Sequence, residues 1–258
     1  MNLSVERLAR MREALAGHVG SGEVPGLVAV VARRGQVHAE ALGAAEIGGP
    51  PMRRDSIFRI ASVTKQITAA AAMTLVEECR LRLDDPVDDL LPELAGRRVL
   101  SRPDAPLDDT VPAHRAITLR DLLTFRLGIG AVMAPPGATP IQRAMDEAGL
   151  SPGPGGHSTE PDEWIKRLGE LPLVHQPGDR WMYDTGSDVL GVLMARATGK
   201  PLEEVLRERL FGPLGMTDTG FHVPAGKLDR LAAAYRTDPA TGDLTLADDR
   251  GRWARPPA

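Results

Sequence analysis

The sequence predicts a protein that mixes α-helices and β-strands, with its strands near the N-terminus and helices over most of the remainder. Three observations predict this order. Residues 26–32 and 37–42 are short apolar runs on either side of an Arg-Arg-Gly turn, as in a β-hairpin. Residues 62–79 are rich in alanine and apolar nearly all round, which is typical of a buried helix. Helical patterns then recur from residue 118 onward.

The remaining elements follow from local signals. Leu8, Met11 and Leu15 fall at helical spacing and predict a first amphipathic helix. Residues 57–60 (IFRI) predict a short strand or extended segment. Cap and proline signals predict four later helices, over residues 118–125, 161–170, 187–198 and 201–211.

The stretch between residues 131 and 160 contains several prolines and glycines and predicts a loop, with SPGPGGHS as its least regular part. A loop of this length is either a lid over a site or a tolerated insertion, and the sequence leaves both open. Two strands and a third short one do not make a stable sheet alone. We therefore expect the strands that complete the sheet to be missing or to lie in the last 35 residues.

Composition excludes several classes of function. The chain of 258 residues has a net charge of −4, so it lacks the basic field that would attract nucleic acid or anionic lipid. No apolar run is long enough to cross a bilayer, and the N-terminal residues lack the pattern of a secretory signal. Together with a single cysteine, Cys79, this predicts a cytoplasmic protein without an internal disulfide. The six histidines show no metal-ligand spacing, so we expect no metal and no cofactor.

A Ser-x-x-Lys arrangement, Ser62-Val63-Thr64-Lys65, begins the predicted buried helix. Residues three apart on a helix share a face, so the lysine amine is expected to lie beside the serine hydroxyl. A serine becomes a nucleophile when a neighbouring base accepts its proton. Lysine is such a base when burial lowers its pKa, whereas arginine is not. A surface lysine on a capped helix gives the same pattern, and burial of the helix favours the catalytic interpretation.

A second candidate residue is Tyr183, in the segment PGDRWMYDTGSDVLG. A tyrosine in a turn between apolar segments could bring its phenol oxygen to the Ser–Lys pair and pass a proton to the leaving group. For a lone tyrosine, a core position with a satisfied hydroxyl is the more common outcome.

Three blocks together resemble the β-lactamase-related serine hydrolases, a superfamily that contains class C β-lactamases, D-Ala-D-Ala peptidases and family VIII carboxylesterases. They are FRIASVTKQITAAAAMTLVEECRLRLDDPV, ITLRDLLTFRLGIG and PGDRWMYDTGSDVLGVLMARATGKPLEEVLRERLFGPLGMTDTGF, in the order seen in the superfamily. The resemblance implies that Ser62 is acylated, that Lys65 assists as base and that Tyr183 is the tyrosine of the second motif. It covers roughly residues 5–225.

The resemblance also implies a β-lactamase/transpeptidase-like fold of an α/β part plus an all-α part. Residues 1–60 would supply the N-terminal helix and strands of an incomplete antiparallel sheet. Residues 61–222 would form the helical domain, and residues 223–258 would begin the return to the α/β domain.

The sequence departs from the family pattern in three places. The second motif usually reads Tyr-x-Asn, whereas Tyr183 is followed here by Asp184 and Thr185, which we take as substrate-binding residues. If Asp184 faced Lys65, its charge would favour the ammonium form and weaken the base. Phe125 stands where many relatives carry a histidine.

The third departure concerns the C-terminal region. The third family motif, on a strand that supplies an oxyanion-hole N–H, is not found before Ala258. Loss of one such donor costs about 100- to 1,000-fold in rate. We therefore expect the chain alone to be unstable or inactive. An unfinished sheet favours self-association, or completion by a separate C-terminal segment.

The sequence as a whole predicts a serine hydrolase that cleaves small-molecule esters or amides, with esters favoured, through an acyl-enzyme on Ser62. Lys65 would act as base and Tyr183 as proton shuttle. A β-lactamase or D-Ala-D-Ala peptidase activity is the first alternative, because the motifs do not separate these reactions. The second alternative is a catalytically silent fragment or binding scaffold of the same fold.

Overall fold

The computed structural model describes residues 3–153, 159–248 and 250–256. The chain divides into two compact units. The terminal unit combines residues 1–59 with residues 220–257, and the central unit comprises residues 60–219. Among the described residues, no helix is both long and apolar enough to cross a membrane.

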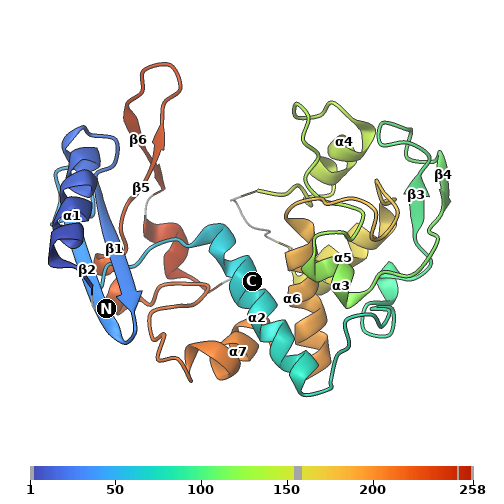
Figure 1. The fold of residues 1–258 in the computed structure, drawn as a ribbon. Coiled ribbons are helices and arrows are strands. Elements are labelled where there is room, and N and C mark those ends of the chain that lie inside the picture. Colours follow the sequence, from blue (N-terminus) through green and yellow to red (C-terminus); the bar gives the residue numbers. More distant parts are fainter. Residues whose placement is uncertain (1–2, 154–158, 249, 257–258) are drawn as a thin grey trace. The chain divides into compact units, whose positions relative to one another are not determined.

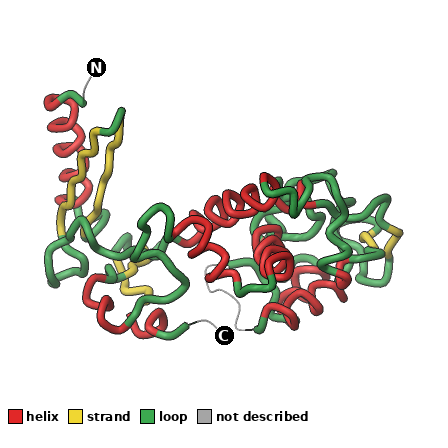
Figure 2. The backbone as a smooth tube through the Cα atoms, turned by 90° about the horizontal axis from the view of Figure 1, so that it is seen from below, coloured by secondary structure: helices red, strands yellow, loops and turns green. Residues whose placement is uncertain are grey.

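The terminal unit begins with a helix that packs on a hairpin (Figures 1 and 2). Its helix and strands are α1 (Val5–Gly20), β1 (Gly26–Arg33), β2 (Gln36–Gly43), β5 (Ala234–Thr237) and β6 (Leu244–Asp248). The Ser4 hydroxyl accepts a hydrogen bond from the Arg7 amide and so caps α1. Strands β1 and β2 are antiparallel and pair from Gly26 with Gly43 to Arg33 with Gln36, which confirms the predicted hairpin.

The C-terminal residues return to the same unit but do not extend that hairpin. Strands β5 and β6 pair with each other, and the described strands form three separate two-stranded sheets. Of the two alternatives for residues 57–60, a strand or an extended segment, no strand forms: Ile57 makes an isolated parallel bridge with Leu231. Its N–H donates to the Arg230 carbonyl at 2.7 Å, and this bridge joins the first and last parts of the unit.

The central unit is mainly helical. Its helices are α2 (Thr64–Glu77), α3 (Leu119–Leu123), α4 (Pro140–Glu147), α5 (Pro161–Glu170), α6 (Thr185–Thr198) and α7 (Leu202–Leu206), and its two strands are β3 (Arg98–Leu100) and β4 (Thr110–Pro112). Helix α6 packs against α2, α3, α5 and α7 (Figure 1), and eight of its 14 residues are buried. The helices predicted after residues 118, 161, 187 and 201 are confirmed.

The structure corrects three of the sequence-based predictions for the central unit. The predicted loop at residues 131–160 contains α4, which Thr139 and Gln142 close with a capping box. Residues 154–158, within the predicted SPGPGGHS loop, lie outside the described residues. Helix α2 buries one face rather than its whole circumference. Cys79, expected in the core, is exposed beyond the end of α2.

Candidate active site

Ser62 lies in a single 3-10 turn, Ala61–Val63, that leads directly into α2. The serine is exposed, so its hydroxyl is open to a substrate. The residue before it, Ala61, has φ 41°, in the left-handed region that residues with a side chain rarely adopt. Such a conformation costs on the order of 1–3 kcal/mol and is retained where the surrounding structure holds it.

The Lys65 ammonium lies between Ser62 and an acidic residue. Its Nζ donates a hydrogen bond to Ser62 Oγ at 3.2 Å and is 2.5 Å from Asp184 Oδ1. The Lys65 and Asp184 side chains are 19% and 15% exposed, so water screens this ion pair only in part. The structure thus brings three of the predicted site residues into direct contact.

The expectation that Lys65 has a lowered pKa is wrong. Desolvation does lower it, but the hydrogen bond and the negative charge of Asp184 outweigh this effect, and the pKa of Lys65 is raised above its usual value. The amine is therefore an ammonium ion at neutral pH. Asp184 therefore faces Lys65, as the sequence allowed, and its charge makes the lysine a weaker proton acceptor at neutral pH.

Tyr183 completes the group through an aromatic cluster. Lys65 Nζ lies 4.8 Å from the centroid of the Tyr183 ring, a cation–π distance. The Trp181 ring stacks on Tyr183 with centroids 5.7 Å apart and an interplanar angle of 26°. Phe125 lies against both rings, at 5.8 Å from Tyr183 and 6.2 Å from Trp181. The ring of Tyr183 is therefore fixed by an ammonium group and two aromatic neighbours.

The backbone of residues 182–187 explains how Asp184, rather than Thr185, reaches the lysine. Asp184 has φ 84° and ψ −77°, and α6 begins with the next residue. Its carbonyl accepts the amide hydrogen of Ser187 at 3.0 Å. Thr185 is 2% exposed and lies within the helix packing. Its predicted role in substrate binding stays a prediction.

The backbone of residues 125–131 holds the segment 182–184 through two hydrogen bonds. The Ala131 amide donates to the Tyr183 carbonyl at 2.8 Å, and the Met182 amide donates to the Phe125 carbonyl at the same distance. At Gly130 an added Cβ would lie 2.6 Å from the Tyr183 carbonyl oxygen. Only glycine lets these two backbone segments approach so closely, so Gly130 helps to position Tyr183.

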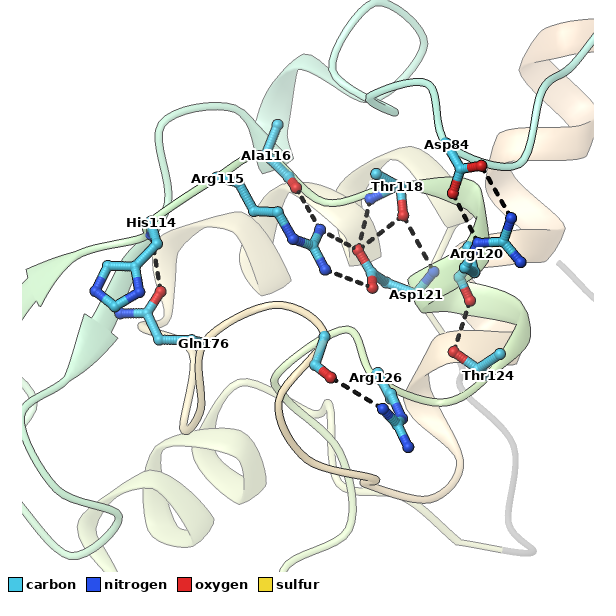
Figure 3. Close-up of polar contacts among 11 residues, drawn as sticks. Asp84, His114, Arg115, Ala116, Thr118, Arg120, Asp121, Thr124, Arg126 and Gln176 are labelled. Carbon is cyan, nitrogen blue, oxygen red and sulfur yellow. Dashed lines mark hydrogen bonds and ion pairs between the residues drawn. The ribbon is translucent and has the colours of Figure 1, made fainter.

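A polar network holds the turn that precedes Trp181 (Figure 3). The buried Asp121 carboxylate accepts two hydrogen bonds from the Arg115 guanidinium, at 2.6 and 2.9 Å, and one from the Thr118 amide at 2.9 Å. The Gly178 amide donates to the Arg126 carbonyl at 2.9 Å, and Arg126 Nη1 donates back to the Gly178 carbonyl at 3.2 Å. A Cβ at Gly178 would collide with Arg115. The network and the turn are therefore packed together.

Backbone strain is concentrated at this site. In the part of the chain that the structure describes, five non-glycine residues have positive φ, and Ala61, Phe125 and Asp184 are three of them. Each adjoins or belongs to the group around Lys65, and strain of this kind clusters at functional sites. The sequence pattern gave no functional role to Trp181 or Phe125. The short spacing of Trp181 and Tyr183 in one turn was the signal for their contact.

Comparisons with known proteins identify the family of the chain. The family model described as "Beta-lactamase" matches residues 11–257. The chain is 47% identical to Protein Rv1367c of Mycobacterium tuberculosis over 190 residues, which are 74% of this chain and 45% of that protein. It is 38% identical to Esterase EstB of Burkholderia gladioli over 212 residues, which are 81% of this chain and 50% of the esterase.

A solved structure, "EstCE1, a hydrolase with promiscuous acyltransferase activity", superimposes with a TM-score of 0.76 at 28% identity. The match covers 95% of this chain and 60% of that one. The chain spans about half the length of the curated relatives it matches. The family model covers nearly the whole chain, and the chain has the fold of the solved relative. The chain therefore belongs to the Beta-lactamase family.

Proposed function

We propose that this chain is the part of a serine hydrolase that takes up the acyl group of an ester on Ser62. The observation that carries the proposal is the contact of Lys65 Nζ with Ser62 Oγ at 3.2 Å, at an exposed serine preceded by a strained residue. A surface lysine on a capped helix would need neither the strain nor a half-buried carboxylate partner. The esterase and hydrolase relatives support the same chemistry.

The reaction has two halves. Ser62 Oγ loses its proton and attacks the ester carbonyl carbon, the bond to the alcohol oxygen breaks, and the alcohol leaves with a proton. Water then attacks the acyl-Ser62 carbonyl, which releases the carboxylic acid and returns the proton to Oγ. The solved relative EstCE1 is a hydrolase with promiscuous acyltransferase activity, as expected when an alcohol replaces water in the second half.

Lys65 and Tyr183 are the proposed proton carriers. Lys65 accepts the Ser62 proton when its amine is neutral, and Asp184 sets how much of the enzyme is in that form. The Tyr183 ring lies beside the same amine, from where the phenol would deliver a proton to the leaving alcohol. In this scheme the rate rises with pH as Lys65 loses its proton.

Turnover assays on the whole chain test the proposal. We expect any hydrolysis of p-nitrophenyl butyrate by the wild type to be lost in Ser62→Ala. Nitrocefin in parallel separates an ester preference from β-lactamase activity. Equal activity of the wild type and Ser62→Ala would remove Ser62 from the mechanism. A folded chain without any turnover would favour a silent scaffold.

A further inference from the structure

Trp181 presents a large apolar ring to solvent beside the candidate nucleophile. The residue is 59% exposed, whereas Trp164 is 3% exposed and packed in the core. Its position is nevertheless well defined, because it stacks on Tyr183 and meets Phe125 at an interplanar angle of 61°. A ring that is held in place by its neighbours and still exposed loses little entropy when a ligand covers it.

The indole is close to the reacting group. The Tyr183 ring, on which it stacks, is 4.8 Å from Lys65 Nζ, and that amine is 3.2 Å from Ser62 Oγ. A substrate whose carbonyl lies at Ser62 contacts Trp181 when one of its two halves carries a ring that extends past Lys65 and the Tyr183 ring. Both halves of an ester are attached to that carbonyl, so the group belongs to either the alcohol or the acyl side.

The electrostatics near Ser62 favour a neutral substrate. The cation that contacts Ser62 is Lys65, and Asp184 already balances its charge. A carboxylate on the substrate would have to compete with Asp184 for this ammonium. An uncharged flat ring gains from stacking on the indole without such a conflict.

From these contacts we propose that Trp181 is a specificity-determining residue that packs against an aryl group of a neutral ester bound at Ser62. The inference rests on the proposed function, since it needs an ester at that serine. It adds the substrate class, aryl esters, and names the residue that selects it. Aryl groups on the alcohol and on the acyl side share this chemistry and are separated by the choice of substrates below.

Steady-state kinetics with three esters provide the first test. Phenyl butyrate carries its ring on the alcohol, ethyl benzoate carries it on the acyl group, and ethyl butyrate has none. In Trp181→Leu we expect KM to rise about tenfold more for one of the aryl esters than for ethyl butyrate, whereas any loss of kcat through the less constrained Tyr183 ring should be the same for all three esters. Trp181→Phe keeps a ring and should restore most of the aryl preference. A uniform change in KM for all three esters would overturn the inference.

A binding measurement tests the inference without turnover. In Ser62→Ala, p-nitrophenyl butyrate should quench tryptophan fluorescence, and phenyl butyrate or ethyl benzoate should displace it better than ethyl butyrate. The quench should be lost in the double variant with Trp181→Leu. A quench that survives in the double variant contradicts the role of Trp181, whatever the activity. Conversely, if the wild type showed no turnover but the quench still depended on Trp181, the proposed esterase activity would be contradicted and the proposed contact between Trp181 and an aryl group would be supported.

Leu214→Ala is the matched control. Leu214 is 68% exposed in the same central unit and belongs to no part of the site. This variant removes an exposed apolar side chain of the same unit and should change neither KM nor the quench. If Leu214→Ala reproduced the effect of Trp181→Leu, the aryl preference would reflect general surface hydrophobicity rather than a site.

Discussion

Lys65 Nζ and Asp184 Oδ1 are 2.5 Å apart, so the ammonium next to the candidate nucleophile is neutralised by the residue directly after Tyr183. In the resembling family the third residue of the Tyr-x-Asn motif is an asparagine, and here that position is the buried Thr185. The φ of 84° at Asp184 turns its side chain toward the lysine instead. A charged partner has thus replaced a neutral amide, which has consequences for pH dependence.

Asp184→Asn should move the acidic limb of the pH–rate profile to lower pH. Burial lowers the pKa of Lys65, but Asp184 raises it by more. The neutral amine therefore forms only at high pH. Without the carboxylate charge the ammonium is less favoured, and Lys65 loses its proton at lower pH. The profile of kcat/KM for p-nitrophenyl butyrate measures this. An unchanged limb would show that Lys65 does not set it.

Lys65→Arg should abolish most of the activity. A guanidinium keeps the positive charge beside Ser62 and Asp184 but does not lose its proton in the working pH range. We expect kcat to fall by about 100-fold or more, the usual contribution of a positioned base. Lys166→Arg, on the exposed side of α5, is the control and should behave as wild type. Retention of activity in Lys65→Arg would mean that the lysine acts only through its charge.

Gly130→Ala should impair catalysis by displacing Tyr183. The new Cβ would lie 2.6 Å from the Tyr183 carbonyl oxygen, so one of the two chain segments must move. Overpacking of this kind costs about 1–3 kcal/mol. We expect a lower Tm by differential scanning fluorimetry and a lower kcat. Gly153→Ala meets no atom within 4 Å and is the matched control. Equal effects of both substitutions would argue against the close approach.

Asp121→Asn should make the protein less stable at neutral pH and less sensitive to acid. Burial raises the pKa of Asp121, but hydrogen bonds from Arg115 and Thr118 lower it more strongly, so the folded pKa lies below the unfolded one. The carboxylate therefore stabilises the fold above its unfolded pKa, and this contribution is lost as pH falls through the folded pKa.

At pH 7 the loss should be about 1.5–3 kcal/mol, the value of hydrogen bonds to a charged group. Urea denaturation between pH 7 and pH 3 checks this, and the difference between wild type and variant should shrink toward low pH. Asp84→Asn removes an exposed ion pair with Arg120 and should have little effect. A difference that is constant with pH would contradict the role of the Asp121 charge.

Elements with strong local signals could be predicted from the sequence. The hairpin, the N-cap at Thr118 and the proline that opens α5 each depend on neighbouring residues, and the structure reproduces them. Helix α4 could not be recognised in the same way, because the glycines and prolines around its capping box hid it. Ile57 pairs with Leu231, more than 170 positions away, and a local pattern does not show that residues 57–60 form a single bridge instead of a strand.

The candidate site shows the same limit. The spacing of Ser62 and Lys65 places them on one helix face, so their contact could be predicted. The partner of Lys65 depends on the backbone angles at Asp184, which the sequence does not specify. Likewise, the three-ring cluster joins Phe125 to Trp181 and Tyr183 from a separate loop, so it appears only once the chain is folded.

Covalent labelling of the intact chain tests the central claim most directly. After incubation with a fluorophosphonate, we predict a mass increase of one phosphonyl group, on the peptide that contains Ser62, and none in Ser62→Ala. A folded wild-type chain that gains no label, or a label that persists in Ser62→Ala, would contradict the assignment of Ser62 as the nucleophile.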